Sequence, residues 1–225
     1  METVVGGKIN MDTTRNQSDT RVTKSTRKGN ITFMVELALL IAIELIMIMT
    51  PLGYLQVGLV QISFLAVPVA IGAVVLGPTA GVVLGLVFGI SSLLQPSGMA
   101  MLGVIPVQSA VLAIVPRLFV GLVPGLVFMG LSKTKMPKPV SVSISCLLAP
   151  LTNSILYCAF MVIFVGDYMA TINPAFEYMA QFGFWKCYGI LLAGLMLNIV
   201  LEAFAGLIVA SAVSNVLLHT VNKSR

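Results

Sequence analysis

Long uncharged apolar runs, broken by proline, glycine and short polar segments, make up most of this chain. Residues 61–95 form one such run, about twice as long as one membrane helix, which needs roughly 20 residues. The run is interrupted at Gly77-Pro78, because proline lacks a backbone donor and disfavours helix in the residue before it. The pattern therefore predicts two membrane helices joined by a tight turn at residues 77–81.

The same pattern of apolar runs and breaks predicts six membrane helices in all. They cover residues 31–50, 59–76, 80–94, 109–131, 140–165 and 185–218. Two of the connections between them are longer. We expect residues 51–58 to form a loop, and residues 95–108 to form an irregular segment that folds back over the helices. The predicted fold class is an all-α membrane protein with a single membrane domain, residues 31–218.

The two ends of the chain are polar. Residues 1–30 lack periodic apolar positions and cannot bury enough apolar surface to offset their ordering entropy. We expect them to form a disordered basic tail, and residues 219–225 to form a short second tail.

The placement of the basic residues predicts the topology. Of 13 Lys and Arg residues, six precede residue 29, three lie in the loop of residues 132–139 and two lie at the C-terminal end. Six helices place all three groups on one side, which the positive-inside rule identifies as the cytoplasm. The loop of residues 166–184, with Asp167 and Glu177, then lies outside. This distribution marks a membrane face and not a nucleic-acid surface.

Composition supports a membrane protein without enzymatic chemistry. The chain is 58% hydrophobic and 9% charged, against about 25% charged residues in soluble domains. Three cysteines and the single His219 show no metal-ligand spacing, so no metal is expected. The P-loop pattern, HExxH and GxSxG are absent from the sequence, so we expect neither ATP hydrolysis by this chain nor a cofactor.

Four polar residues fall at membrane depth, where such groups are costly and commonly functional. They are Arg117, Asn153, Asn198 and Glu202. Asn198 and Glu202 are spaced i,i+4 and share a helix face. Similar depths on three helices predict one polar pocket, suited to a small anionic or carboxylate-bearing ligand. The alternative is a structural Arg117–Glu202 ion pair with the two amides joining helices.

Other polar and small residues allow two interpretations each. Glu44 either faces the pocket or stabilises its helix against a neighbour. Tyr157, one turn from Asn153, either covers the ligand or packs in the interior, and packing is the more common role. The ladder Gly81, Gly85 and Gly89 permits close helix approach, as in any tightly packed membrane helix.

Several of these segments resemble one known family. PLGYLQVG followed by LGPTAGVVLGLVFGISSLLQ is similar to the substrate-capture (S) components of energy-coupling factor (ECF) vitamin transporters. VPRLFVGLVPGLVF, LTNSILY and NIVLEAF resemble the same family. The likeness covers about residues 33–218 and is nearest to the pantothenate-type members, whereas the polar tail departs from the family pattern.

The resemblance implies a capture protein in the bacterial plasma membrane, without ATPase activity of its own. It would bind a vitamin from outside, beneath the helix 1–2 and helix 3–4 loops, through Arg117, Asn153, Asn198 and Glu202. Transport would need a membrane coupling (T) component and two cytoplasmic ATPases. In such proteins an AxxxA motif on the first helix contacts the coupling component, and Ala38 and Ala42 match it.

Three functions remain open at this point. The first is capture of pantothenate. The second is capture of riboflavin, a folate or hydroxymethylpyrimidine, although a flavin would need more aromatic surface than one Trp and five Tyr readily provide. The third is a polytopic scaffold protein that binds no small ligand.

Overall fold

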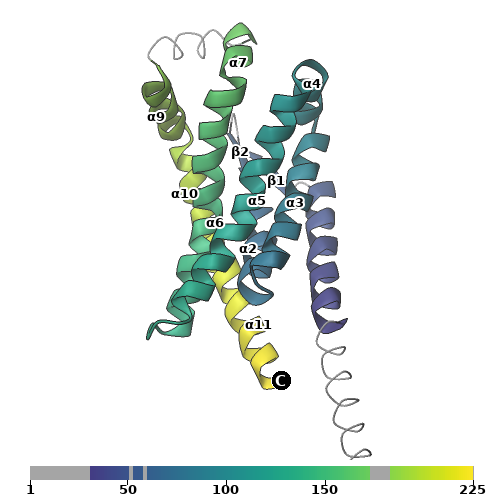
Figure 1. Cartoon of the computed structure of the whole chain (residues 1–225), viewed down its shortest axis with the longest axis vertical. Coiled ribbons are helices and arrows are strands. Elements are labelled where there is room, and N and C mark those ends of the chain that lie inside the picture. The colour runs from purple at the N-terminus through teal and green to yellow at the C-terminus, as the bar shows by residue number, and fades with distance from the viewer. Residues whose placement is uncertain (1–30, 51–52, 58–59, 173–182, 225) are drawn as a thin grey trace, which may run out of the picture. The chain divides into compact units, whose positions relative to one another are not determined.

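The computed structural model describes residues 31–50, 53–57, 60–172 and 183–224. The predicted tail of residues 1–30 lies outside the described residues, as does most of the predicted outer loop, at residues 173–182. Contacts divide the chain into two units, Met1–Leu39 and Leu40–Arg225. The boundary falls within the first helix, and all elements discussed after that helix belong to the second unit (Figure 1).

Helices long and apolar enough to cross a membrane dominate the described chain. Four stretches meet this condition: Ile31–Met49, Pro106–Leu131, Lys138–Tyr168 and Asn198–His219. A fifth span results if α3 (Pro78–Leu94) and α4 (Pro96–Val104), bent by 77° at Gln95, count as one. Helix α2 (Ala66–Val75) is apolar but shorter. The helical membrane architecture is confirmed, whereas six spans and two cytoplasmic ends remain predictions.

A β-hairpin replaces part of the predicted first loop and second helix. Strands β1 (Tyr54–Val57) and β2 (Val60–Ser63) pair antiparallel with Tyr54 opposite Ser63. The amide of Phe64 donates to the Gly53 carbonyl at 3.1 Å and closes the hairpin at its base. The prediction of a helix from residue 59 was therefore wrong for its first part. Tyr, Val and Ile, which favour strands, occupy this segment on both sides of Gly58.

The segment predicted to be irregular, residues 95–108, is mostly helical. Pro96 and Pro106 occupy the first turns of α4 and α5 (Pro106–Leu131). Proline is well tolerated there, because its missing N–H has no partner in the first turn and its φ suits a helix. The two prolines that suggested an irregular chain therefore begin helices.

The turn predicted at residues 77–81 is confirmed at its first residues. Helix α2 ends at Val75, Gly77 has φ of 101°, and Pro78 begins α3. A side chain would strain this left-handed backbone, so glycine suits the position. The turn reverses the chain and brings α3 back beside α2, and α3 then packs along α5.

The glycine ladder of α3 packs directly on α5. A Cβ atom at Gly81 would collide with the Gly121 carbonyl, and one at Gly85 would collide with the Arg117 carbonyl. At Gly89 a Cβ atom would lie 3.0 Å from the Ala113 carbonyl oxygen. The four-residue spacing of the ladder therefore matches that of α5 and fixes the backbone that carries Arg117.

The last two predicted membrane helices are both interrupted in the structure, and both extend further than predicted. Helix α6 (Lys138–Phe160) continues through the π-helical segment η1 (Met161–Val165) into α7 (Gly166–Ile172). Beyond residue 182 come α9 (Phe184–Gly194), α10 (Met196–Ala205), the π-helical segment η2 (Gly206–Ala210) and α11 (Ser211–Ser224). The single helix predicted over 185–218 is thus interrupted at Leu195. The predicted tail of residues 219–225 is helical as far as Ser224.

Candidate functional site

Polar side chains from α5, α6 and α10 meet in the interior of the second unit. Arg117, Asn153 and Glu202 are all at most 8% exposed, and Asn198 is half-buried. The Glu202 carboxyl interacts with the side chains of Asn198 and Asn153 and with the charge of Arg117. The four residues predicted to share a pocket are therefore close together in the structure.

The hairpin lies against this cluster. Glu202 Oε1 accepts a hydrogen bond from the backbone amide of Ser63, the last residue of β2, at 2.9 Å. Figure 1 shows β1 and β2 in the half of the helices away from the loop that joins α5 to α6, and β2 contacts α10. The segment between the first and second helices thus covers one side of the polar cluster.

A proline holds Arg117 in place. Pro116 has no N–H, so the carbonyl of Leu112, four residues earlier, loses its helical partner. Arg117 Nη1 donates to that carbonyl oxygen at 2.9 Å, and Nη2 makes a longer contact of 3.3 Å with Ser92 Oγ on α3. Pro116 therefore frees an acceptor that orients the guanidinium group.

Aromatic rings cover the guanidinium group of Arg117. Its Cζ lies 4.7 Å from the centre of the Tyr157 ring and 5.4 Å from the centre of the Phe88 ring. Rings at these distances stabilise a cation through their electron-rich faces. Arg117 Nε is buried and makes no hydrogen bond. The edge formed by Nε and Nη2 is thus the part of Arg117 with hydrogen-bonding capacity left.

Arg117 and Glu202, both described with their side chains, do not form a direct ion pair. Arg117 binds Leu112 and Ser92, and Glu202 Oε1 binds the Ser63 amide. Arg117 Nε and Glu202 Oε2 have no hydrogen-bond partner. The two side chains therefore interact through their charges without a direct hydrogen-bonded ion pair, and the structural role that was the alternative for them stays a prediction.

Buried polar atoms without hydrogen-bond partners are concentrated around this site. Such atoms are rare in folded proteins, because each costs about 1–3 kcal/mol. Among the described residues they are Glu44 Oε1 and Oε2, Tyr54 OH, Ser63 Oγ, Arg117 Nε, Asn153 Oδ1, Asn198 Oδ1 and Glu202 Oε2. Most are acceptors. The cluster can therefore receive hydrogen bonds from a polar ligand and donate to it from Arg117.

Sequence reasoning missed the residues that connect the hairpin and α3 to this cluster. Tyr54 interacts with Ser91 and Ser92 and with the charges of Arg117 and Glu44. Burial raises the pKa of Tyr54 above its usual value, and the contact with Ser91 partly offsets this. Its position in the PLGYLQVG segment was the available signal.

Glu44, which the sequence left ambiguous, is fully buried near Tyr54. Its side chain is 0% exposed and both of its carboxyl oxygens lack a hydrogen-bond partner. Of the two interpretations, proximity to Tyr54 favours the one in which Glu44 faces the polar cluster.

The predicted partner motif lies on an exposed face of the first helix. Ala38 and Ala42 are both exposed and are four residues apart, so they share that face. Larger apolar neighbours on the same helix are also exposed, among them Leu39 at 61% and Ile46 at 64%. The face is thus apolar with two small residues in it.

The described part of the chain contains no cluster of three His, Cys, Asp or Glu side chains that could hold a metal ion. Cys146, Cys158 and Cys187 are buried and free.

Comparison with known families agrees with this arrangement. The family model described as "ECF transporter, substrate-specific component" matches residues 32–218. The chain belongs to this family. S components are membrane subunits that bind the substrate of an ECF transporter, and they are transport proteins that associate with a T component and ATPases. No curated protein matches the chain.

Proposed function

We propose that this S component captures a B vitamin from outside the cell, with pantothenate as the first candidate. Uptake is then driven by ATP hydrolysis in a complex with a T component and two cytoplasmic ATPases. The observation that carries the proposal is that Arg117, Asn153, Asn198 and Glu202, which lie close together, each have a buried polar atom without a hydrogen-bond partner. Pantothenate has a carboxylate at one end, two hydroxyls toward the other end and an amide N–H between them.

The edge of Arg117 formed by Nε and Nη2 suits the carboxylate. Nη1 is held by Leu112, Nε is unpaired, and Nη2 has only the 3.3 Å contact with Ser92. Two parallel N–H groups on a planar guanidinium match the two oxygens of a carboxylate. The rings of Tyr157 and Phe88 restrict approach to this edge.

The acceptors of the site suit the other end of the molecule. Glu202 Oε2, Asn153 Oδ1 and Asn198 Oδ1 can each receive a hydrogen bond from a hydroxyl or amide group. In this proposal Tyr157 contacts the ligand through the ring that covers Arg117. A ligand that donated to all three oxygens would remove most of the cost of leaving them unpaired.

Other vitamins would use these groups differently. An amino-bearing pyrimidine such as hydroxymethylpyrimidine would place its amine on Glu202 and leave Arg117 without a role. Riboflavin and folates carry large ring systems, and the aromatic rings at the guanidinium are only Phe88 and Tyr157 in the described chain. A scaffold protein without a ligand would leave the buried acceptors unexplained.

The proposal is tested by calorimetry on the purified chain in detergent. We expect saturable, ATP-independent binding of pantothenate, and much weaker binding of panthenol, in which an alcohol replaces the carboxylate. Replacing Arg117 with Met removes the charge at similar length, and we expect pantothenate affinity to fall about 10- to 100-fold. We expect Glu202→Gln to weaken the binding of both pantothenate and panthenol. The substitution removes one of the carboxylate oxygens that would accept hydrogen bonds from either compound.

Each other outcome changes a different part of the proposal. Equal affinity for panthenol and pantothenate would remove the carboxylate from Arg117 and keep the class of ligand. Riboflavin, a folate and hydroxymethylpyrimidine complete the panel of ligands, and tight binding of one of these would keep capture and replace pantothenate. Folded protein that binds none of the panel would favour the scaffold function.

A further inference from the structure

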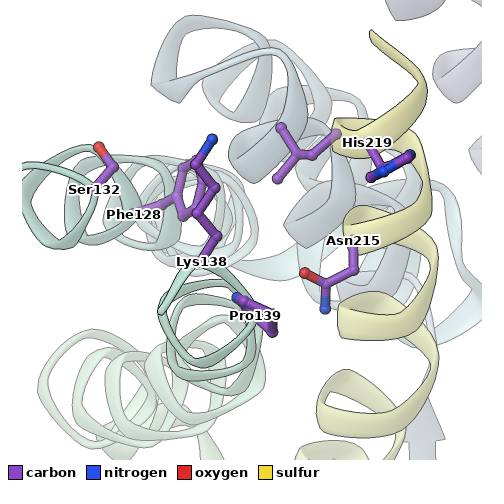
Figure 2. A pocket seen from close by; sticks show the side chains of 7 residues that line it. Phe128, Ser132, Lys138, Pro139, Asn215 and His219 are labelled. Carbon is purple, nitrogen blue, oxygen red and sulfur yellow. The ribbon is translucent and has the colours of Figure 1, made fainter. Parts of the chain in front are cut away.

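A second region of interest lies about three helical turns along α5 from Arg117, where α5 ends and α6 begins. A cleft of about 1020 Å³ opens there between α5, α6 and α11. Its lining is Phe128, Ser132, Lys138, Pro139, Asn215, Leu218 and His219. Figure 2 shows Asn215 and His219 on α11, across the cleft from Lys138 and Pro139.

The cleft is positively charged. Lys138 is its one permanent charge, and it begins α6, so the positive end of the helix dipole points the same way. The sequence has no Asp or Glu in residues 103–166 or 203–225, which include all three helices of the cleft. Carboxylates from these helices are therefore not available to neutralise Lys138.

Apolar side chains form another part of the cleft lining. Phe128 and Leu218 line it, and the outer surfaces of α5 and α11 expose Leu126, Met129 and Val216. A small inorganic anion would interact with the charge and leave these apolar walls without a partner. An occupant with an anionic head and a hydrocarbon tail would use both parts.

The cleft also lies at the depth where a lipid headgroup is found. It is formed by the ends of three candidate membrane spans, Pro106–Leu131, Lys138–Tyr168 and Asn198–His219. At such ends the hydrocarbon core gives way to the headgroup layer. The loop between α5 and α6 adds Lys133 and Lys135 at the same level.

We propose that this cleft is a binding site for an anionic phospholipid. Lys138 and His219 hold the phosphate, Asn215 donates a hydrogen bond to the headgroup, and one acyl chain lies on Phe128 and Leu218. A zwitterionic lipid would bring the positive group of its headgroup near Lys138. The three helices of the cleft have no carboxylate that could pair with that group. One basic residue near an anionic lipid is worth about a fivefold preference.

The test is native mass spectrometry of the full chain in detergent, titrated with phosphatidylglycerol and, separately, phosphatidylcholine. We expect the first phosphatidylglycerol to bind about fivefold more tightly than the first phosphatidylcholine. Lys138→Gln should remove that preference. The matched control is Lys135→Gln, which removes the same charge from the adjacent α5–α6 loop, outside the cleft lining. A symmetric peak in size-exclusion chromatography identifies variants that fold.

The remaining outcomes overturn the proposal. Equal affinity for the two lipids would show that the cleft does not select an anionic headgroup. An equal loss in Lys138→Gln and Lys135→Gln would assign the preference to the charge of the whole loop. Unchanged lipid binding in Lys138→Gln, with weaker assembly on the T component, would make the cleft a protein contact.

Discussion

At the scale of single residues, the site depends on a proline that makes no contact with a ligand in our proposal. Pro116 leaves the Leu112 carbonyl without its helical donor, and Arg117 Nη1 fills that place at 2.9 Å. Prolines inside membrane helices are tolerated where a neighbouring group satisfies the freed carbonyl. Here the neighbouring group is the proposed ligand-binding side chain, so the proline is part of the site although it would not touch the ligand.

The role of Pro116 gives a prediction. Pro116→Ala restores a backbone N–H that competes with Arg117 for the Leu112 carbonyl. We expect pantothenate affinity to fall about tenfold, the cost of one weakened charged hydrogen bond, without loss of thermal stability. Calorimetry and a thermal unfolding curve measure the two quantities.

The matched control is Pro124→Ala, which restores an N–H two turns further along α5, away from Arg117. It should leave affinity unchanged. If the two variants lose affinity equally, helix flexibility and not the Leu112 contact explains the effect.

At the scale of helices, the α3–α5 contact sets the position of Arg117. The ladder was visible in the sequence, but its partner was not, because small residues indicate close approach without naming the helix that approaches. Gly85 faces the backbone carbonyl of Arg117 itself. A change at Gly85 therefore reaches the site through α5.

We predict that Gly85→Ala weakens both stability and binding. Its Cβ would collide with the Arg117 carbonyl, so α3 and α5 must separate, at a cost of about 1–3 kcal/mol. We expect a lower unfolding temperature and loss of vitamin binding together. The control is Gly130→Ala near the end of α5, where a Cβ atom meets nothing within 4 Å. A Gly85→Ala protein with unchanged stability would contradict the contact described here.

The sequence predicted the long helices well and the short elements poorly. Hydropathy over about 20 residues identifies a span without tertiary information, which is why Pro106–Leu131 was found nearly in full. The hairpin consists of two strands of four residues each in an uncharged segment, where hydropathy does not distinguish a strand from a helix. The bend before α4 does not follow from the sequence, because a proline can either break a helix or begin one.

The site shows the same division. Arg117, Asn153, Asn198 and Glu202 were predictable, because polar groups at membrane depth stand out against an apolar background. Tyr54, Ser63 and Ser92 were not, because they join the site through the hairpin and α3, whose folding could not be derived from local sequence. The absence of an Arg117–Glu202 ion pair depends on distances that a sequence does not contain.

The exposed face of the first helix carries a further prediction. We propose that Ala38 and Ala42 contact the T component, because two small residues four apart allow close helix approach. Replacing both with Trp should prevent assembly with the T component while vitamin binding persists, since both side chains are exposed. Co-purification measures assembly, and Ile43→Trp, also exposed and on the same helix, is the control. Normal assembly of the double variant would exclude this face as the contact.

At the scale of the whole molecule, function depends on which side of the membrane each end of the helices faces. Capture from outside requires the α5–α6 loop to lie inside and the segment after α6 to lie outside. Four or five candidate spans are described, and α2 and the hairpin occupy the part of the chain where a further crossing was predicted. Whether α2 completes a crossing determines the side on which Lys135 lies.

Cysteine labelling in intact cells tests this topology. The three native cysteines are buried and should react slowly, so single cysteines introduced at Lys135 and at Asp167 can be compared in an otherwise unchanged chain. Six spans predict that a membrane-impermeant maleimide labels the cysteine at 167 from outside, and the cysteine at 135 only after lysis. The reverse labelling pattern would mean that the chain has the opposite orientation in the membrane. It would place the proposed lipid site in the outer leaflet and the vitamin site toward the cytoplasm, which is incompatible with uptake.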